Sequence, residues 1–345
     1  MAQAHVWTGR VLQPAALAVL EGLATISVSS VGERNDWYTE ASTADAIIVA
    51  GETFVTNEVM DRIGPRLRII ARTGIGVDRI DLDAATRHGI LVVNTPDGPT
   101  ESTAEHTIAL LLNLCKQVMI SDRILRAGQP YPALKELTPG LEVAGAVLGL
   151  VGLGRIGSRV AAIARILGMK VIAFDPFITP ERASTLGVEL VPALAELLPR
   201  AHVVSLHCPA TAETYHIMNA GTLNLMPKGS YLVNVARGPL IDEAALLEAL
   251  RSGHLAGAAL DVFDPEPAVT NHPLFTLPNT ICTPHIGSYT SASVLRIQVM
   301  ACEEIASALR GERPTHLVNA EVWGLLPHPF PDFVERDGSN QTTDR

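Results

Sequence analysis

The sequence is poor in cysteine and lacks long hydrophobic runs. Its four cysteines, Cys115, Cys208, Cys282 and Cys302, are scattered without a CxxC spacing, so neither a disulfide framework nor a metal site is expected. We interpret them as reduced, mostly buried thiols in a cytoplasmic protein. The longest apolar stretch, residues 143–153, is broken by glycines and is shorter than the roughly 20 residues of a transmembrane helix. No membrane span is therefore expected.

Basic residues are also in deficit. The sequence has 26 Lys+Arg against 36 Asp+Glu, which gives a formal net charge of −10. Binding to nucleic acid or to an anionic membrane needs clustered Lys and Arg, so neither partner is expected. The length of 345 residues favours two domains, at about 100–200 residues each.

Short β-branched runs alternate with helical patterns along most of the chain, which is typical of βαβ units and parallel sheets. Strands are predicted in two series, at residues 4–9, 24–30, 45–51, 67–73 and 90–95, and at residues 145–151, 169–175, 202–208, 230–236, 257–263 and 280–286. Helices are predicted at residues 57–64, 81–89, 100–119 and 291–311. Residues 121–140 contain prolines and are expected to be looser, and little order is expected after Trp323.

A glycine-rich turn follows the first strand of the second series. The sequence G-x-G-x-x-G, with Gly152, Gly154 and Gly157, is followed by a helical pattern. In this context the first glycine allows a tight turn, the second lets the backbone approach a pyrophosphate, and the third lets helix and strand pack closely. The helix N-terminus offers free N–H groups and partial positive charge to phosphates. The pattern predicts a dinucleotide site.

Asp175 ends the next predicted strand, eighteen residues after Gly157. A carboxylate at this position accepts hydrogen bonds from both ribose hydroxyls of the adenosine and repels a 2′-phosphate. No basic residue follows it directly. The sequence therefore favours NAD over NADP as the cofactor.

Three further segments place polar residues at predicted strand ends, where α/β sheets carry their sites. Arg237 follows strand 230–236, Asp261 and Glu266 lie in the segment GAALDVFDPEP, and His285 lies in TPHIGS. The arginine fork suits a carboxylate or carbonyl oxygen, histidine exchanges a proton near neutral pH, and a nearby carboxylate favours the imidazolium. Taken singly, each residue has an ordinary alternative as a salt-bridge partner, a core histidine or a solvated loop carboxylate.

Taken together, the motifs resemble the D-isomer-specific 2-hydroxyacid dehydrogenases over roughly residues 40–320. The resemblance rests on ARTGIGVDRID (71–81), NTPDGPTESTAEHTIALLL (94–112), VGLGRIG (151–157), LHCPATAETYHIMN (206–219), LVNVARGPLIDEAALLEAL (232–250), GAALDVFDPEP (257–267) and TPHIGS (283–288). It implies NAD-dependent hydride transfer at C2 of a small 2-hydroxy or 2-keto acid.

The resemblance also implies individual roles. It makes Arg237, Glu266 and His285 catalytic, with His285 as the general acid and base. It adds to the cofactor site Arg155, Ile156, Pro209, Ala236 and Asp261, the last on the carboxamide side of the nicotinamide. It assigns the substrate to Arg237, Thr53 and the backbone N–H groups around Gly74, Ile75 and Gly76.

The implied fold is α/β with two doubly wound parallel-sheet domains. Residues 1–97 plus 290–322 would form a flavodoxin-like substrate domain, and residues 98–289 a Rossmann NAD-binding domain, with the active site in the cleft. Residues 323–345 would form a poorly ordered tail. Family members are usually homodimers, and the region around residues 120–145 would reach across the interface.

Some alternatives stay open at this stage. Phosphoglycerate-type relatives often have a basic residue in the loop at residues 50–54, where this chain has Glu52; 3-phosphoglycerate is therefore disfavoured as the substrate without being excluded. A formate or phosphite dehydrogenase on the same scaffold is a second possibility, although formate enzymes carry glutamine where this chain has Glu266. A third is an NAD-sensing corepressor, which can retain the catalytic residues.

Overall fold

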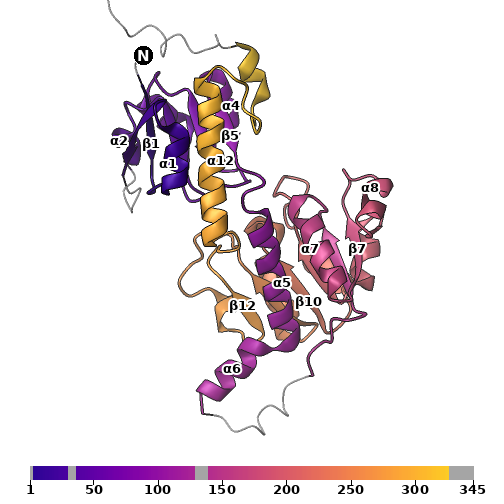
Figure 1. Ribbon diagram of the computed structural model, residues 1–345. Helices are drawn as coiled ribbons and strands as arrows, with labels where there is room; N and C mark the ends of the chain where they lie inside the picture. Colours follow the sequence, from indigo (N-terminus) through magenta and orange to yellow (C-terminus); the bar gives the residue numbers. More distant parts are fainter. Residues whose placement is uncertain (1–2, 30–35, 129–138, 326–345) are drawn as a thin grey trace, which may run out of the picture. The chain divides into compact units, whose positions relative to one another are not determined.

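The structure, a computed structural model, describes residues 3–29, 36–128 and 139–325 (Figure 1). The chain divides into two compact units: unit 1 consists of Met1–Pro99 and Thr290–Arg345, and unit 2 of Thr100–Tyr289. Of the tail predicted at residues 323–345, all but the first three residues lie outside the described ones.

A five-stranded parallel sheet forms the centre of unit 1. Its strands are β1 (Ala4–Thr8), β2 (Ala24–Val28), β3 (Ala46–Val49), β4 (Ile69–Arg72) and β5 (Leu91–Asn94). They follow the order β2-β1-β3-β4-β5, which is the flavodoxin-like order. The runs AIIV in β3 and LVVN in β5 suit a sheet covered on both faces, and β3 is buried along its whole length.

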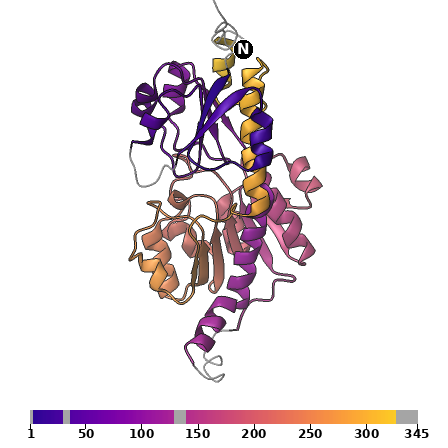
Figure 2. The ribbon, with the colours of Figure 1, turned by 60° about the vertical axis from the view of Figure 1, so that its left-hand side comes forward.

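Helices flank this sheet. They are α1 (Pro14–Leu20), α2 (Trp37–Glu40), α3 (Asn57–Ile63), α4 (Leu82–Arg87) and α12 (Ser291–Leu309), followed by a 3-10 turn at Ala320–Leu325. Three of them begin at an N-cap side chain: Thr56 accepts from the N–H of Val59 at 3.4 Å, Asp81 from that of Ala84 at 2.9 Å and Thr290 from that of Ser293 at 3.2 Å. Although α12 follows the second series of strands, it runs alongside α1 and packs on β4 and β5 (Figure 2). Its end of the chain therefore belongs to unit 1.

Unit 2 contains a seven-stranded parallel sheet. Its strands are β6 (Val147–Val151), β7 (Lys170–Phe174), β8 (Glu189–Leu190), β9 (Val203–Leu206), β10 (Ser230–Asn234), β11 (Leu255–Leu260) and β12 (Thr280–Cys282). The order β12-β11-β10-β9-β6-β7-β8 is the Rossmann order with one added strand. Val151, at the end of β6, pairs with Leu206 of β9 on one side and Phe174 of β7 on the other. The strand order therefore reverses beside β6.

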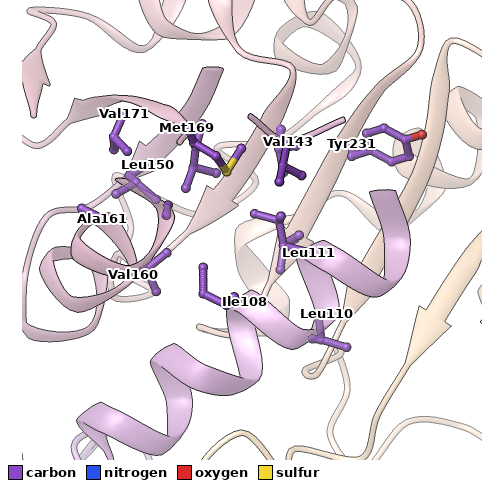
Figure 3. Packing of buried hydrophobic residues seen from close by; sticks show 14 of the residues in the cluster. Ile108, Leu110, Leu111, Val143, Leu150, Val160, Ala161, Met169, Val171 and Tyr231 are labelled. Carbon is purple, nitrogen blue, oxygen red and sulfur yellow. The ribbon is translucent and has the colours of Figure 1, made fainter. Parts of the chain in front are cut away.

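The helices of unit 2 pack on this sheet. They are α5 (Thr100–Lys116), α6 (Val118–Arg126), α7 (Arg155–Ile166), α8 (Pro180–Thr185), α9 (Leu194–Leu197), α10 (Ala220–Leu225) and α11 (Glu243–Arg251). One core lies between α5, α7 and the sheet, where Leu111, Val160, Leu150 and Met169 are buried together (Figure 3). The predicted architecture of two doubly wound parallel sheets is confirmed. Within the described ranges, no helix is both long and apolar enough to cross a membrane.

The segment after α5 differs from the prediction. The predicted helix at residues 100–119 stops at Lys116, because Gln117 adopts a left-handed conformation with φ 56°. A new helix, α6, starts at once, and its Met119 N–H is held by Asn113 Oδ1 at 3.0 Å. An Asp122–Arg126 pair one turn apart supports it. The expected looseness is therefore wrong for the helical part, and residues 129–138 lie outside the described ones.

Candidate active site

The glycine-rich turn lies at the carboxyl end of β6, where the strand order of unit 2 reverses. Gly152 has φ 98°, and a Cβ there would lie 2.8 Å from the backbone nitrogen of Cys208. A Cβ on Gly157 would lie 2.3 Å from the carbonyl oxygen of Gly152. Around Gly154, by contrast, a Cβ would meet nothing within 4 Å. The first and third glycines are thus required by the fold itself, and the second leaves an open space.

This open space fits a dinucleotide. Gly154 is the N-cap of α7, and Arg155 and Ile156 are its first two residues, so N–H groups of the first turn and the positive end of the helix dipole are available there. Asp175, directly after β7, accepts a hydrogen bond from the N–H of Leu153 at 2.7 Å. Its other oxygen accepts from the N–H of Phe177 at 2.9 Å. The carboxylate is therefore anchored next to the glycine turn.

Pro209 and Ala236 follow the two strands beyond this turn. Pro209 comes after β9, and its carbonyl oxygen accepts from Thr214 Oγ1 at 2.7 Å. Ala236 comes after β10, and its N–H donates to Asn234 Oδ1 at 3.0 Å. These contacts fix the loops at the same edge of the sheet; the cofactor roles of both residues remain predictions.

The three residues predicted to be catalytic follow three neighbouring strands. Arg237 comes after β10, Glu266 after β11 and His285 after β12, and these strands are adjacent in the sheet. His285 Nδ1 forms a hydrogen bond with Glu266 Oε1. His285 has a left-handed backbone with φ 53°, and its side chain is 40% exposed. The imidazole therefore has a carboxylate on Nδ1 while part of the ring remains accessible.

Hydrogen bonds and close packing fix the loop that carries Arg237. Asn234, which is fully buried, donates through Nδ2 to the carbonyl oxygen of Arg237 at 2.8 Å. Arg237 Nη1 donates to the carbonyl oxygen of Ala236 at 2.7 Å. The next residue, Gly238, passes so close to the segment after β11 that a Cβ would lie 2.0 Å from the carbonyl oxygen of Phe263. This packing fixes the loop that carries the arginine.

Asp261, which is 1% exposed, organises the segment around His285. Its carboxylate accepts from Thr283 Oγ1 at 2.6 Å, from the N–H of Ile286 at 2.9 Å and from the N–H of Gly287 at 2.8 Å. Burial raises the pKa of Asp261, but hydrogen bonds from His106, Thr283 and the two N–H groups outweigh it and hold the pKa below its ordinary value. The predicted contact with the nicotinamide remains a prediction.

A hollow of about 480 Å³ opens beside the His285–Glu266 pair within unit 2. Its lining includes Arg123 of α6, Phe275 and Cys282. Burial raises the pKa of the Cys282 thiol to about 11, so the thiol is neutral. The hollow has a largely apolar wall with one cation and the ionisable pair at its edge.

The predicted substrate residues of unit 1 follow β3 and β4. Gly74, with φ 135°, donates its N–H to Thr95 Oγ1 at 2.7 Å. Within the described residues no hydrogen bond engages the N–H of Ile75 or Gly76, so these two are the better candidates for binding a carboxylate. Thr53 Oγ1 is buried and has no hydrogen-bond partner in the described part of the chain. Their substrate roles remain predictions.

Comparison with known proteins identifies the family. The family model "D-isomer specific 2-hydroxyacid dehydrogenase, NAD binding domain" matches residues 108–287. The chain belongs to the D-isomer specific 2-hydroxyacid dehydrogenase family. Unit 2 is accordingly its NAD-binding domain, and the formation of the glycine turn beside Asp175 agrees with that assignment.

Individual relatives extend this assignment over both units. The chain is 40% identical over 304 residues to D-3-phosphoglycerate dehydrogenase from Methanocaldococcus jannaschii, covering 88% of this chain and 57% of the relative. The TT0316 protein from Thermus thermophilus superimposes with a TM-score of 0.83 at 40% identity, covering 91% of this chain and 99% of that one. A glyoxylate reductase from Paecilomyes thermophila gives a TM-score of 0.82 at 30% identity, with coverages of 92% and 99%. The chain spans little more than half the length of the curated relatives it matches.

Sequence reasoning overlooked three residues near His285. Arg123 lies in the segment expected to be loose, and its place in the hollow depends on α6. His106 and Thr283 lie within quoted motifs, but only the fold brings them to Asp261. Only Thr283, a polar residue two positions before His285, offered a local sequence signal for these supporting contacts.

Proposed function

We propose that the protein is an NAD-dependent dehydrogenase that transfers a hydride between the nicotinamide and C2 of a small D-2-hydroxy acid or the corresponding 2-keto acid. The observation that carries this proposal is the hydrogen bond between His285 Nδ1 and Glu266, at strand ends next to the one that carries Arg237. An acid–base histidine, its carboxylate and an anion-binding arginine are the groups that this reaction needs.

The pairing assigns a proton to each atom of the imidazole. Because Nδ1 faces Glu266, Nε2 is the nitrogen that gives its proton to the C2 oxygen during reduction and takes the hydroxyl proton during oxidation. Glu266 stabilises the imidazolium with which reduction begins. Arg237 binds the carboxylate or carbonyl oxygen of the substrate and sets its orientation.

NAD, when bound, supplies the hydride acceptor, and NADH the donor. Gly152, Gly154, Arg155, Ile156 and Gly157 would hold its pyrophosphate, and Asp175 its ribose; Pro209, Ala236 and Asp261 complete the proposed site. The support is the open space at Gly154 above the N-terminus of a 12-residue helix.

We also propose that the protein works in the cytoplasm as a homodimer. The four cysteines are free thiols, as is usual in a reducing compartment. Helix α6 has no buried residue and exposes Val118 and Leu125, which a second subunit would cover.

D-3-phosphoglycerate is a second candidate substrate. It is favoured by the names of the relatives that share 40–43% of their residues with this chain. Against it stands the absence of a basic residue between positions 50 and 54. Glyoxylate and hydroxypyruvate represent the small unphosphorylated class.

The experiment that tests the function is a turnover assay with NADH and a panel of 2-keto acids, with the chirality of the product determined. The wild type is expected to form D-2-hydroxy acids, and His285→Ala to lose about two to four decades of kcat, the usual contribution of a general acid–base residue. NADH binding without turnover of any panel member would indicate a cofactor-sensing protein. Near-wild-type turnover by His285→Ala would overturn the assigned roles.

A further inference from the structure

His106, on helix α5, contacts the residues that hold the segment carrying His285. Its Nε2 lies 3.3 Å from Thr283 Oγ1 and 3.5 Å from Asp261 Oδ1. The side chain is 18% exposed. Together with Thr283 and Asp261 it therefore forms a largely buried polar cluster within unit 2.

This cluster fixes an unusual backbone conformation. His285 is left-handed, with φ 53°, a conformation that is unfavourable for a non-glycine residue and persists where the surroundings impose it. Asp261 imposes this backbone conformation through both its main chain and its side chain. Its carbonyl oxygen accepts from the N–H of His285 at 2.8 Å, and its carboxylate accepts from the N–H groups of Ile286 and Gly287.

The hydrogen-bond pattern determines which ring nitrogen of His106 carries a proton. Thr283 donates its hydroxyl hydrogen to Asp261 Oδ1 at 2.6 Å, so the hydroxyl oxygen is an acceptor toward His106. Asp261 Oδ1 is also an acceptor. Nε2 of His106 therefore carries a hydrogen and donates it toward both oxygens.

The ring of His106 also limits the space beside the turn. A Cβ added to Gly287 would lie 3.0 Å from Asp261 Oδ2 and 3.6 Å from Cδ2 of His106. The space beside Gly287 is therefore bounded by the carboxylate of Asp261 and by the ring of His106. A loss of the Nε2 donor would let both Thr283 and Asp261 reorient.

We propose that His106 is a positioning residue for the catalytic histidine: its Nε2–H orients Thr283 and Asp261, which in turn hold His285 in the left-handed turn that directs its imidazole. The inference rests on the proposed function, because it assigns His106 a part in that same reaction. His106 itself touches neither substrate nor cofactor in this scheme.

The test compares two substitutions of different chemistry. His106→Gln keeps an N–H donor at nearly the same reach, whereas His106→Leu keeps the bulk and removes the donor. His106→Leu is expected to lower kcat for 2-keto acid reduction about tenfold, the value of one hydrogen bond to a charged group, with KM for the 2-keto acid unchanged. His106→Gln should recover most of kcat. Glu105→Gln, an exposed change on the same helix, serves as the matched control and should match the wild type.

A double-mutant cycle separates positioning from general support of the fold. If His106 acts through His285, adding His106→Leu to His285→Ala should leave the residual rate unchanged within about twofold. Thr283→Val removes only the intervening hydroxyl and should reproduce the loss in kcat; it also carries the test if His106→Leu does not fold.

Three outcomes would overturn the inference while leaving the proposed function intact. They are a wild-type kcat in His106→Leu, an equal loss in His106→Gln, and an undiminished loss in the His285→Ala background. A wild-type protein that turns over no 2-keto acid would overturn the proposed function and this inference together.

Discussion

His285 and Glu266 are nineteen positions apart in the sequence, yet they are joined by a hydrogen bond at His285 Nδ1 across the ends of neighbouring strands. In the proposed mechanism, this contact leaves Nε2 as the nitrogen for proton exchange. It also makes the carboxylate the counterion of the imidazolium. We therefore expect the two directions of the proposed reaction to depend on Glu266 to different degrees.

Glu266→Gln should slow reduction more than oxidation. Reduction starts from the imidazolium, which loses its counterion, whereas oxidation starts from the neutral imidazole. Since the imidazole is 40% exposed, the loss is expected to be roughly three- to tenfold in kcat for reduction at neutral pH. Rates in both directions at pH 7 and pH 9 check this. Equal losses in the two directions would contradict the assigned role.

The glycines of the turn should respond differently to alanine. Gly154→Ala meets open space in the protein, so its melting temperature without cofactor should match the wild type. Its NADH affinity should fall at least about tenfold, because the added methyl occupies the space into which a pyrophosphate fits. Gly157→Ala, whose Cβ would lie 2.3 Å from the Gly152 carbonyl oxygen, should instead destabilise the protein. Calorimetry and NADH titration of both variants separate the two effects.

The sequence predicted features that leave a local pattern. Buried strands such as AIIV at residues 46–49 and the turn at Gly152 are encoded by adjacent residues. The pattern did not predict the two-residue strand β8, which is too short for a period. It also missed the break at Gln117, where a single left-handed residue divides an otherwise continuous helical pattern.

The supporting contacts of the site depend on tertiary structure. His106 and Thr283 are 177 positions apart, and no local periodicity relates them. The loop at residues 50–54 predicts a negative charge at Glu52, but the sequence does not show that Arg10, 42 positions away, lies beside it. Sequence motifs thus identify groups that react, whereas the residues that orient or neutralise them emerge only when the chain is folded.

Asp175 offers a test of cofactor choice. Its carboxylate supports Leu153 and is expected to repel a 2′-phosphate. Asp175→Asn retains an oxygen for the N–H of Leu153 but removes the charge, whereas Asp175→Ala removes both. Asp175→Asn should lower the NADH:NADPH ratio of kcat/KM about tenfold, the scale of one close charge, while keeping most of its NADH affinity. Asp175→Ala should lose both the preference for NADH and the affinity for it. A wild type equally efficient with both cofactors would contradict the prediction.

Glu52 offers a test of substrate charge. Burial raises its pKa, but a backbone hydrogen bond, the Arg10 contact and the charge of Arg72 outweigh it, so the pKa is below its ordinary value and the carboxylate is ionised at neutral pH. Glu52→Gln removes this charge and releases Arg10. Because the pair is exposed, the specificity ratio of 3-phosphoglycerate to an unphosphorylated D-2-hydroxy acid should rise only roughly two- to fivefold. Arg10→Gln should shift the ratio the other way. An unchanged ratio in both variants would place the pair outside the substrate's influence.

His207 should make the protein less stable in acid. It follows β9 and packs against the glycine turn. Its Nδ1 is buried without a hydrogen-bond partner in the described residues, and its Nε2 lies 2.9 Å from Ser205 Oγ. Burial lowers the pKa of His207 to about 3, whereas histidine in an unfolded chain titrates near 6.5. As the pH falls below about 6.5, the unfolded chain gains a proton that the folded protein does not, so the free energy of unfolding decreases. Between pH 6.5 and pH 5 this single group would account for a decrease of about 1–2 kcal/mol in the free energy of unfolding.

His207→Gln fills a similar volume without titrating, so its free energy of unfolding should fall less over the same interval, even if it starts lower at pH 7. Urea denaturation of both proteins at several pH values measures the two slopes, and equal slopes would show that His207 is not the group responsible.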